Sequence, residues 1–125
     1  MKNKALEYFV NGGCSCSESI VKAAIEQGLC PKEFFPAATA FSGGMSSGCV
    51  CGTVAAAQMI SGFNNPVDAR ANAKFIVDEF KKRNKVTCCR VLSKGLQGAE
   101  KKQHCSKFVA DVCEILEDVI KTKVK

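Results

Sequence analysis

Nine cysteines in a chain of 125 residues are the side chains most able to do chemistry in this sequence. Seven of them lie in Cys14-Ser15-Cys16, Cys49-Val50-Cys51 and Cys88-Cys89, and at the isolated Cys105. Thiolates bind soft metal ions and undergo reversible oxidation. We therefore expect these thiols to act as ligands or redox centres rather than as inert core residues.

The elements that carry these thiols favour a shared site. Cys16, Cys51 and Cys89 lie in or beside predicted first turns of helices, with Thr87 able to cap the third of these segments. A helix start stabilises a thiolate through its free N–H groups and its dipole. Cys105 lies on the apolar side of the last predicted helix. Four thiolates from four helices would suit a soft metal, although their spacing matches neither the bacterial ferredoxin run nor a zinc ribbon.

Helical periodicity dominates the chain and predicts an all-α fold, a compact multi-helix bundle that forms a single domain over residues 1–125. Ser15 followed by Glu18 is a capping-box pattern at the start of one helix. No alternating apolar and polar run is long enough to predict a strand. The predicted helices are Ser17–Gln27, Cys51–Ile60, Pro66–Asn84, and a last helix from Gly98 or Ala99 to Ile120. The second of these should end near Gly62. The segment Pro31–Phe41 is predicted to be a short helix or a pair of turns.

Two of these helices have a clear apolar face that should contact the core. The predicted core residues are Ala73, Ile76, Val77 and Phe80 in one helix and Phe108 or Val109, Val112, Leu116 and Val119 in the last.

The net charge of +6 arises largely from lysines and arginines at predicted helix ends. Nucleic-acid binding is not expected, since the eight Phe residues fall mostly at apolar helical positions instead of alternating with basic residues. No segment resembles a signal peptide or reaches the roughly 20 apolar residues of a membrane span, so we expect a cytoplasmic protein without membrane contact. A positive surface would attract an acidic redox partner protein.

The segment from Gly43 to Gly48 has the glycine spacing of a phosphate-binding loop, but Cys49-Val50 follows where that chemistry needs Lys and Ser or Thr. We expect instead that these glycines let the backbone approach a bound group next to Cys51. An ordinary turn between two helices is the alternative.

Several segments resemble a known family of redox-active proteins, named after the pattern C_GCAxxG_C_C. They are Gly13–Ile20, the glycine segment Phe41–Met45, Cys51–Ala57, Cys89–Leu92, and His104-Cys105 followed by an apolar helix. The resemblance spans nearly the whole chain. It departs from the family pattern at Thr53, where the pattern has Ala, and at Ala56, where it has Gly.

This resemblance implies that Cys16, Cys51, Cys89 and Cys105 are the functional set. The chain is also similar to the part of split-Soret cytochromes associated with an iron–sulfur cluster, but it lacks the Cys-x-x-Cys-His that would attach a c-type haem. We therefore expect an iron–sulfur redox or electron-transfer protein rather than a conventional enzyme, and no catalytic residue is assigned. The residues beside the cofactor would be Gly43, Gly44 and Gly52, whose loop N–H groups would bond to sulfur.

The remaining cysteines leave alternatives open. Cys14, Cys49 and Cys88 form a second rank of candidate ligands, while Cys30 and Cys113 are expected to be small core residues. A metal-free thiol–disulfide protein would use Cys14 with Cys16 or Cys49 with Cys51. A zinc- or copper-binding protein would use the same soft ligands, and a homodimer in which a second subunit completes the site also remains open.

Overall fold

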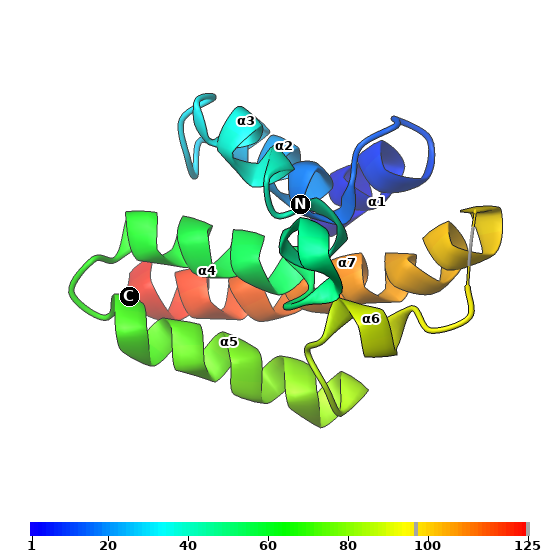
Figure 1. The fold of residues 1–125 in the computed structure, drawn as a ribbon. Coiled ribbons are helices and arrows are strands. Elements are labelled where there is room, and N and C mark those ends of the chain that lie inside the picture. Colours follow the sequence, from blue (N-terminus) through cyan, green and yellow to red (C-terminus); the bar gives the residue numbers. More distant parts are fainter. Residues whose placement is uncertain (97, 125) are drawn as a thin grey trace.

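The computed structural model describes residues 1–96 and 98–124 and confirms an all-α, single-domain bundle (Figure 1). Across these ranges no strand forms, apart from one isolated antiparallel bridge between Val50 and Cys88. The elements are α1 (Lys2–Val10), α2 (Cys16–Glu26), α3 (Phe34–Thr39), the π-helical turn η1 (Gly44–Gly48), α4 (Gly52–Asn64), α5 (Ala69–Asn84), α6 (Cys89–Leu92) and α7 (Gly98–Val124).

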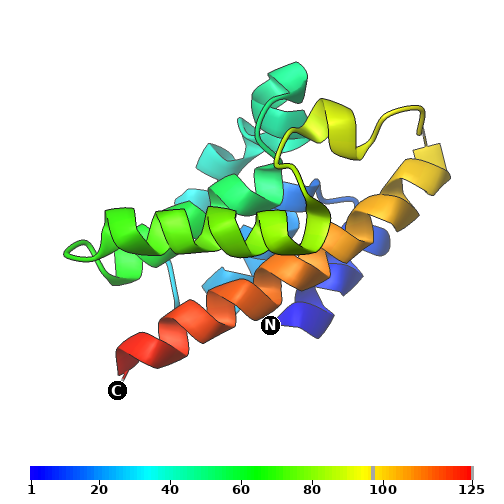
Figure 2. The ribbon, with the colours of Figure 1, turned by 90° about the horizontal axis from the view of Figure 1, so that it is seen from below.

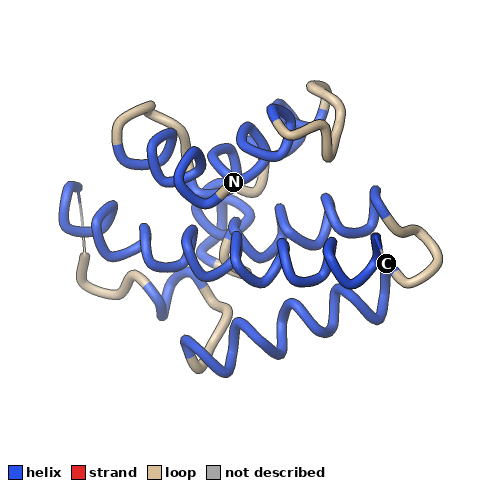
Figure 3. Tube along the Cα trace, turned by 180° about the vertical axis from the view of Figure 1, so that it is seen from behind, coloured by secondary structure: helices blue, strands red, loops and turns tan. Residues whose placement is uncertain are grey.

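The long helix α7 is the element around which the others pack. It contacts α1, α2, α4 and α5, and α4 and α5 also contact each other (Figure 2). On the side away from α5, helices α1, α2 and α3 cover the bundle, as the view from behind shows (Figure 3). The short elements η1 and α6 pack against each other beside this bundle. The core is therefore shared by segments from both halves of the chain.

The predicted apolar face of the last helix is confirmed. Its members are all buried, namely Phe108, Val109, Val112, Leu116 and Val119. On α5, Ile76 and Phe80 are fully buried, whereas Ala73 and Val77 are only half-buried. The spacing of three and four residues thus identified the correct sides of both helices.

Several predicted helix bounds differ from the structure. The element expected over Pro31–Phe41 is helical only from Phe34 to Thr39, and the last helix continues past Ile120 to Val124. Helix α5 begins at Ala69 rather than Pro66, because the Asn65 side chain accepts the Asp68 N–H at 3.2 Å and donates to the Asp68 carboxylate at 2.9 Å. This local turn takes up Pro66 before the helix starts. Helix α4 continues past Gly62 to Asn64, since tertiary packing against α5 supports its last turn.

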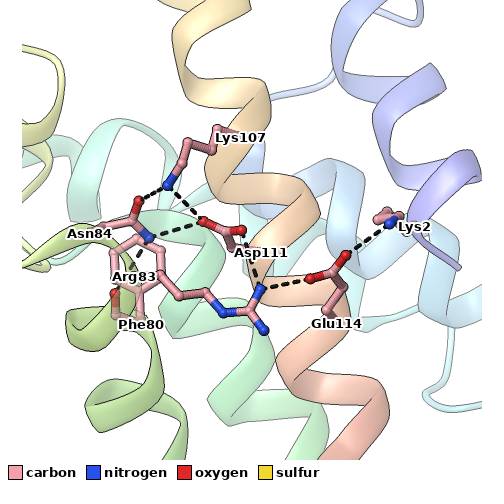
Figure 4. Close-up of polar contacts among 7 residues, drawn as sticks. All are labelled: Lys2, Phe80, Arg83, Asn84, Lys107, Asp111 and Glu114. Carbon is pink, nitrogen blue, oxygen red and sulfur yellow. Dashed lines mark hydrogen bonds and ion pairs between the residues drawn. The ribbon is translucent and has the colours of Figure 1, made fainter.

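A polar network holds α7 to its neighbours (Figure 4). Arg83 of α5 donates to Asp111 at 3.3 Å and to Glu114 at 2.7 Å. Lys107 contacts Asp111 at 3.1 Å, and Lys2 of α1 contacts Glu114 at 2.8 Å. Exposed pairs contribute little stability individually, but a shared network fixes how the helices lie against each other. It thereby positions the helix that carries Cys105.

No helix in the described ranges combines the length and the apolar character of a membrane-spanning segment.

Candidate thiol site

One cavity of about 220 Å³ brings five cysteines together. Cys16 lies at the start of α2, Cys51 precedes α4, Cys89 begins α6 and Cys105 lies on α7, while Cys14 comes from the loop before α2. The cavity is also lined by Phe9, Ser15, Gly43, Leu92, Ser93, Gly98, Lys101, Lys102 and Phe108. We call this space the thiol cavity. All four cysteines of the family pattern line it.

The remaining cysteines lie elsewhere. Cys49 is exposed, and the half-buried Cys88 donates its S–H to the Gly48 carbonyl at 3.2 Å. Cys30 and Cys113 are buried in the hydrophobic core and do not line the thiol cavity. Of the three second-rank candidates, the structure therefore brings only Cys14 to the cavity, and it is buried there.

Cys51 is the thiol with the clearest preference for the charged form. It occupies the N-cap position of α4 and is 4% exposed. A hydrogen bond from Cys16 lowers the pKa of Cys51 to about 6, and the Thr53 hydroxyl, 3.0 Å from its sulfur, and the first N–H groups of α4 add to this effect. Burial opposes it but does not outweigh these contacts. These contacts therefore favour the thiolate form of Cys51.

Cys16 is held as the neutral partner of Cys51. Donating its proton to the Cys51 sulfur raises the pKa of Cys16 well above the ordinary thiol value, and burial acts in the same direction. Its position follows from the predicted capping box, which the structure confirms: Ser15 and Glu18 exchange both hydrogen bonds at the start of α2. Thr39 also donates to Glu18 at 2.6 Å, which ties this helix start to α3.

Cys89 and Cys105 complete the wall of the cavity as neutral thiols. Burial raises the pKa of Cys89, and it raises the pKa of Cys105 to about 11. The nearby charge of Cys51 acts in the same direction, whereas the ammonium group of Lys101 favours the thiolate form of both. The site thus combines one stabilised thiolate, three neutral thiols of the family pattern and a positive charge at its edge.

A short backbone pairing sets two of these cysteines side by side. The N–H of Cys51 donates to the Thr87 carbonyl at 2.7 Å, and the N–H of Cys89 donates to the Cys49 carbonyl at 2.5 Å. The prediction that Thr87 caps the helix of Cys89 was wrong, since Cys88 is the N-cap and makes no side-chain capping bond. This pairing joins segments distant in sequence, so no local pattern could have indicated it.

The three candidate cofactor glycines lie around the cavity in different ways. Gly43 lines it, while Gly44 is buried, with space so tight that a Cβ there would lie 2.5 Å from the Cβ of Cys89. A Cβ on Gly52 would lie 3.1 Å from the sulfur of Cys16. Gly44 and Gly52 therefore allow the backbone to come close to two of the thiols.

The N–H groups of the glycine turn were expected to bond to sulfur. Two amides of this turn have other partners, because Met45 donates to the Phe41 carbonyl at 3.0 Å and Cys49 to the Gly44 carbonyl at 2.8 Å. The contacts to the Cys51 sulfur come instead from Cys16, Thr53 and the start of α4. Bonds from the N–H groups of Gly43, Gly44 and Gly52 to the sulfur of a bound group stay a prediction.

The donor set fits a soft metal or an iron–sulfur cluster, since four thiols on separate elements face one cavity. In the described parts of the chain, however, no group of three or more His, Cys, Asp or Glu side chains is arranged to hold a metal ion. The exposed His104 does not line the cavity; its Nε2 lies 2.9 Å from the Leu92 carbonyl.

The fold and the cavity together define a helical protein with a thiol site assembled from distant segments. A family model described as "Putative redox-active protein (C_GCAxxG_C_C)" matches residues 14–119, and the chain belongs to this family. No curated protein and no solved structure matches the chain. Membership of the family supports a redox role.

Proposed function

We propose that the protein is an iron–sulfur redox or electron-transfer protein whose cluster is bound by Cys16, Cys51, Cys89 and Cys105. The observation that carries this proposal is the convergence of these four cysteines, which come from four separate elements, on the thiol cavity. Two thiols suffice for a reversible disulfide. Four around one cavity match the usual ligand number of an iron–sulfur cluster.

The surroundings of the cavity support an anionic centre. Lys101 and Lys102 line it and would offset part of the charge of four thiolates. Lys101 already favours the thiolate forms of Cys89 and Cys105. A bound cluster would supply one-electron chemistry, and the protein would set its potential through burial and hydrogen bonds to sulfur.

The apolar lining would limit water at the site. Phe9 and Phe108 are buried and line the thiol cavity together with Leu92. Thr53, which departs from the family pattern, places a hydroxyl against the Cys51 sulfur. The hydroxyl would stabilise charge on the Cys51 sulfur, while the apolar lining would limit the access of solvent.

The test is to purify the protein without oxygen, record its visible spectrum, and assay iron, acid-labile sulfide, zinc and copper per chain. We expect iron and sulfide in near-equal amounts. Cys51→Ser and Cys105→Ser should each lose most of both. Cys49→Ser and Cys30→Ser should retain them, because these thiols lie outside the cavity. Loss of iron in these two controls to the same extent would contradict the proposed ligand set.

A metal-free dithiol protein is the second candidate, and a specific contact favours it. The thiolate of Cys51 and the thiol of Cys16 are in hydrogen-bond contact, which is the arrangement of a reactive dithiol. Oxidation would join their sulfurs and pass two electrons and the Cys16 proton to a disulfide acceptor, which would take its second proton from water. This pair differs from the Cys-x-Cys pairs that the sequence suggested.

The same preparation distinguishes the remaining candidates. The protein could instead be metal-free and form a Cys16–Cys51 disulfide in a glutathione redox buffer, as mapped by mass spectrometry. That result would favour the dithiol proposal over the cluster proposal. Zinc or copper without sulfide would indicate a metal-binding protein instead. We also propose a cytoplasmic location, because all nine cysteines are free and a reducing compartment preserves free thiols.

A further inference from the structure

A second hollow in the surface lies directly beside the thiol cavity. This open groove of about 490 Å³ shares Gly43, Cys89, Ser93 and Lys101 with the cavity. We call it the basic groove; its other lining residues are Ser47, Gly48, Arg90, Lys94 and Gly95. Cys89 therefore forms part of the wall between the proposed redox centre and the surface.

The lining of the groove is positively charged. Arg90, Lys94 and Lys101 line it, and no Asp or Glu does so among the described residues. None of the three belongs to an ion pair within the described ranges, and Arg90 donates to the Ser47 carbonyl at 2.9 Å. Glu100, next to Lys101 in the sequence, is exposed.

Three cations that contact carboxylates of α7 are placed differently. Lys2, Arg83 and Lys107 are each paired with a carboxylate of α7. Their charges are thus largely neutralised within the molecule, whereas those of the basic groove remain available to an external anion.

Two exposed apolar side chains lie in the short elements that help to form this groove. Met45 in η1 is 46% exposed and Val91 in α6 is 56% exposed. These two elements pack against each other, and both contribute lining residues to the groove. A small anion would make no favourable contact with exposed apolar side chains, whereas protein interfaces combine an apolar centre with a polar rim.

We propose that the basic groove, together with Met45 and Val91, is the docking surface for an acidic one-electron carrier protein. This inference rests on the proposed redox function and names its partner. Carboxylates of the partner would pair with Arg90, Lys94 and Lys101, which would speed the encounter and orient the complex. The partner is the oxidant or reductant, and one electron passes by way of Cys89 without any covalent bond forming or breaking.

The experiment uses the protein as purified without oxygen and an acidic flavodoxin as the probe. Binding is measured by calorimetry at low and at physiological salt. Carboxylate–lysine contacts are then joined with a carbodiimide and mapped by mass spectrometry. We expect binding that weakens as salt increases, and cross-links at Lys94 and Lys101. The double variant Lys94→Glu/Lys101→Glu should bind at least about tenfold more weakly.

The matched control is Lys32→Glu/Arg70→Glu, which makes the same change in charge at exposed positions. Lys32 precedes α3 and Arg70 lies in the first turn of α5, and neither residue lines the groove. Figure 1 shows the α4–α5 connection at the end of the bundle away from α6. The control should bind flavodoxin within about twofold of the unchanged protein, since exposed charges outside an interface contribute little.

Three results would overturn the proposal: no binding of flavodoxin, cross-links mainly outside the groove, or equal weakening in both double variants. A fourth is inorganic phosphate at millimolar concentration blocking flavodoxin at constant ionic strength, which would make the groove a small-anion site. Because the assay measures binding, the two proposals can fail separately. If the protein contains no cluster but binds flavodoxin as expected, only the proposed cluster is refuted. A bound cluster without docking would refute this inference alone.

Discussion

The Thr53 hydroxyl offers a direct test of how the fold stabilises charge on Cys51. Thr53 is fully buried, and its oxygen lies 3.0 Å from the Cys51 sulfur. Thr53→Val keeps the shape of the side chain and removes this hydrogen bond. We expect the pKa of Cys51 in the metal-free, reduced protein to rise from its value of about 6.

The size of the shift follows from the contacts. A hydrogen bond to a charged group contributes about 1.5–3 kcal/mol, and one pKa unit corresponds to about 1.4 kcal/mol. Cys16 is the larger contributor at Cys51 and remains in the variant, so we expect a shift of about one unit, at the low end of this range. At pH 5.5 the thiolate fraction would then fall from about a quarter to about 3%, roughly eightfold.

The assay is a pH titration of ¹³Cβ-labelled cysteine followed by NMR, which reports Cys51 separately from the other thiols. The rate of alkylation of Cys51 at pH 5.5, read by mass spectrometry in a Cys49→Ser background, gives a second measure. Thr87→Val is the matched control, because within the described structure the Thr87 hydroxyl has no hydrogen bond while its carbonyl accepts from Cys51. An unchanged midpoint in Thr53→Val, or an equal shift in Thr87→Val, would refute the reasoning.

Further predictions concern the glycine turn, the helix cap and the polar network. Gly44→Ala should lower the free energy of unfolding by at least about 2 kcal/mol more than Gly95→Ala in urea titrations, because both have positive φ but only Gly44 would meet Cys89; equal losses would contradict this. Glu18→Gln should cost about 1 kcal/mol at pH 7. Because the fold lowers the pKa of Glu18, the stability that this carboxylate contributes is present above pH 4.5 and is lost at lower pH. The melting temperatures of the two proteins should therefore converge on acidification, and a difference that stayed constant would contradict this. Arg83→Met should cost no more than about 1 kcal/mol in urea, since its ion pairs are partly exposed, and a much larger loss would show that the network is more than a surface contact.

The local parts of the site could be predicted from the sequence. Ser15 and Glu18 identify the start of α2, and this places Cys16 in its first turn. Cys51 was also expected at the start of a helix, and in the structure it is the N-cap residue of α4. Capping signals depend on residues three or four apart, so they can be read without the fold.

The parts that depend on distant contacts could not be predicted. Helix α1 was missed, although Ala5 and Phe9 are buried, because it is only nine residues long and packs mainly against α7 and α2. The contact between Cys16 and Cys51 was also missed, since neighbours in sequence had suggested Cys-x-Cys pairs. The fold instead exposes Cys49 and buries Cys51, which is the N-cap residue of α4.

The state of the thiols bears on which redox chemistry the cavity serves. A dithiol needs one thiolate and one partner, and Cys51 with Cys16 already provides both. Cys89 and Cys105 would be superfluous in that reaction, and burial keeps them neutral and weakly nucleophilic. A soft metal, by contrast, deprotonates the thiols that bind it. Cys89 and Cys105, which line a cavity with Lys101 and Lys102 at its edge, therefore suit the role of metal ligands better than that of additional nucleophiles.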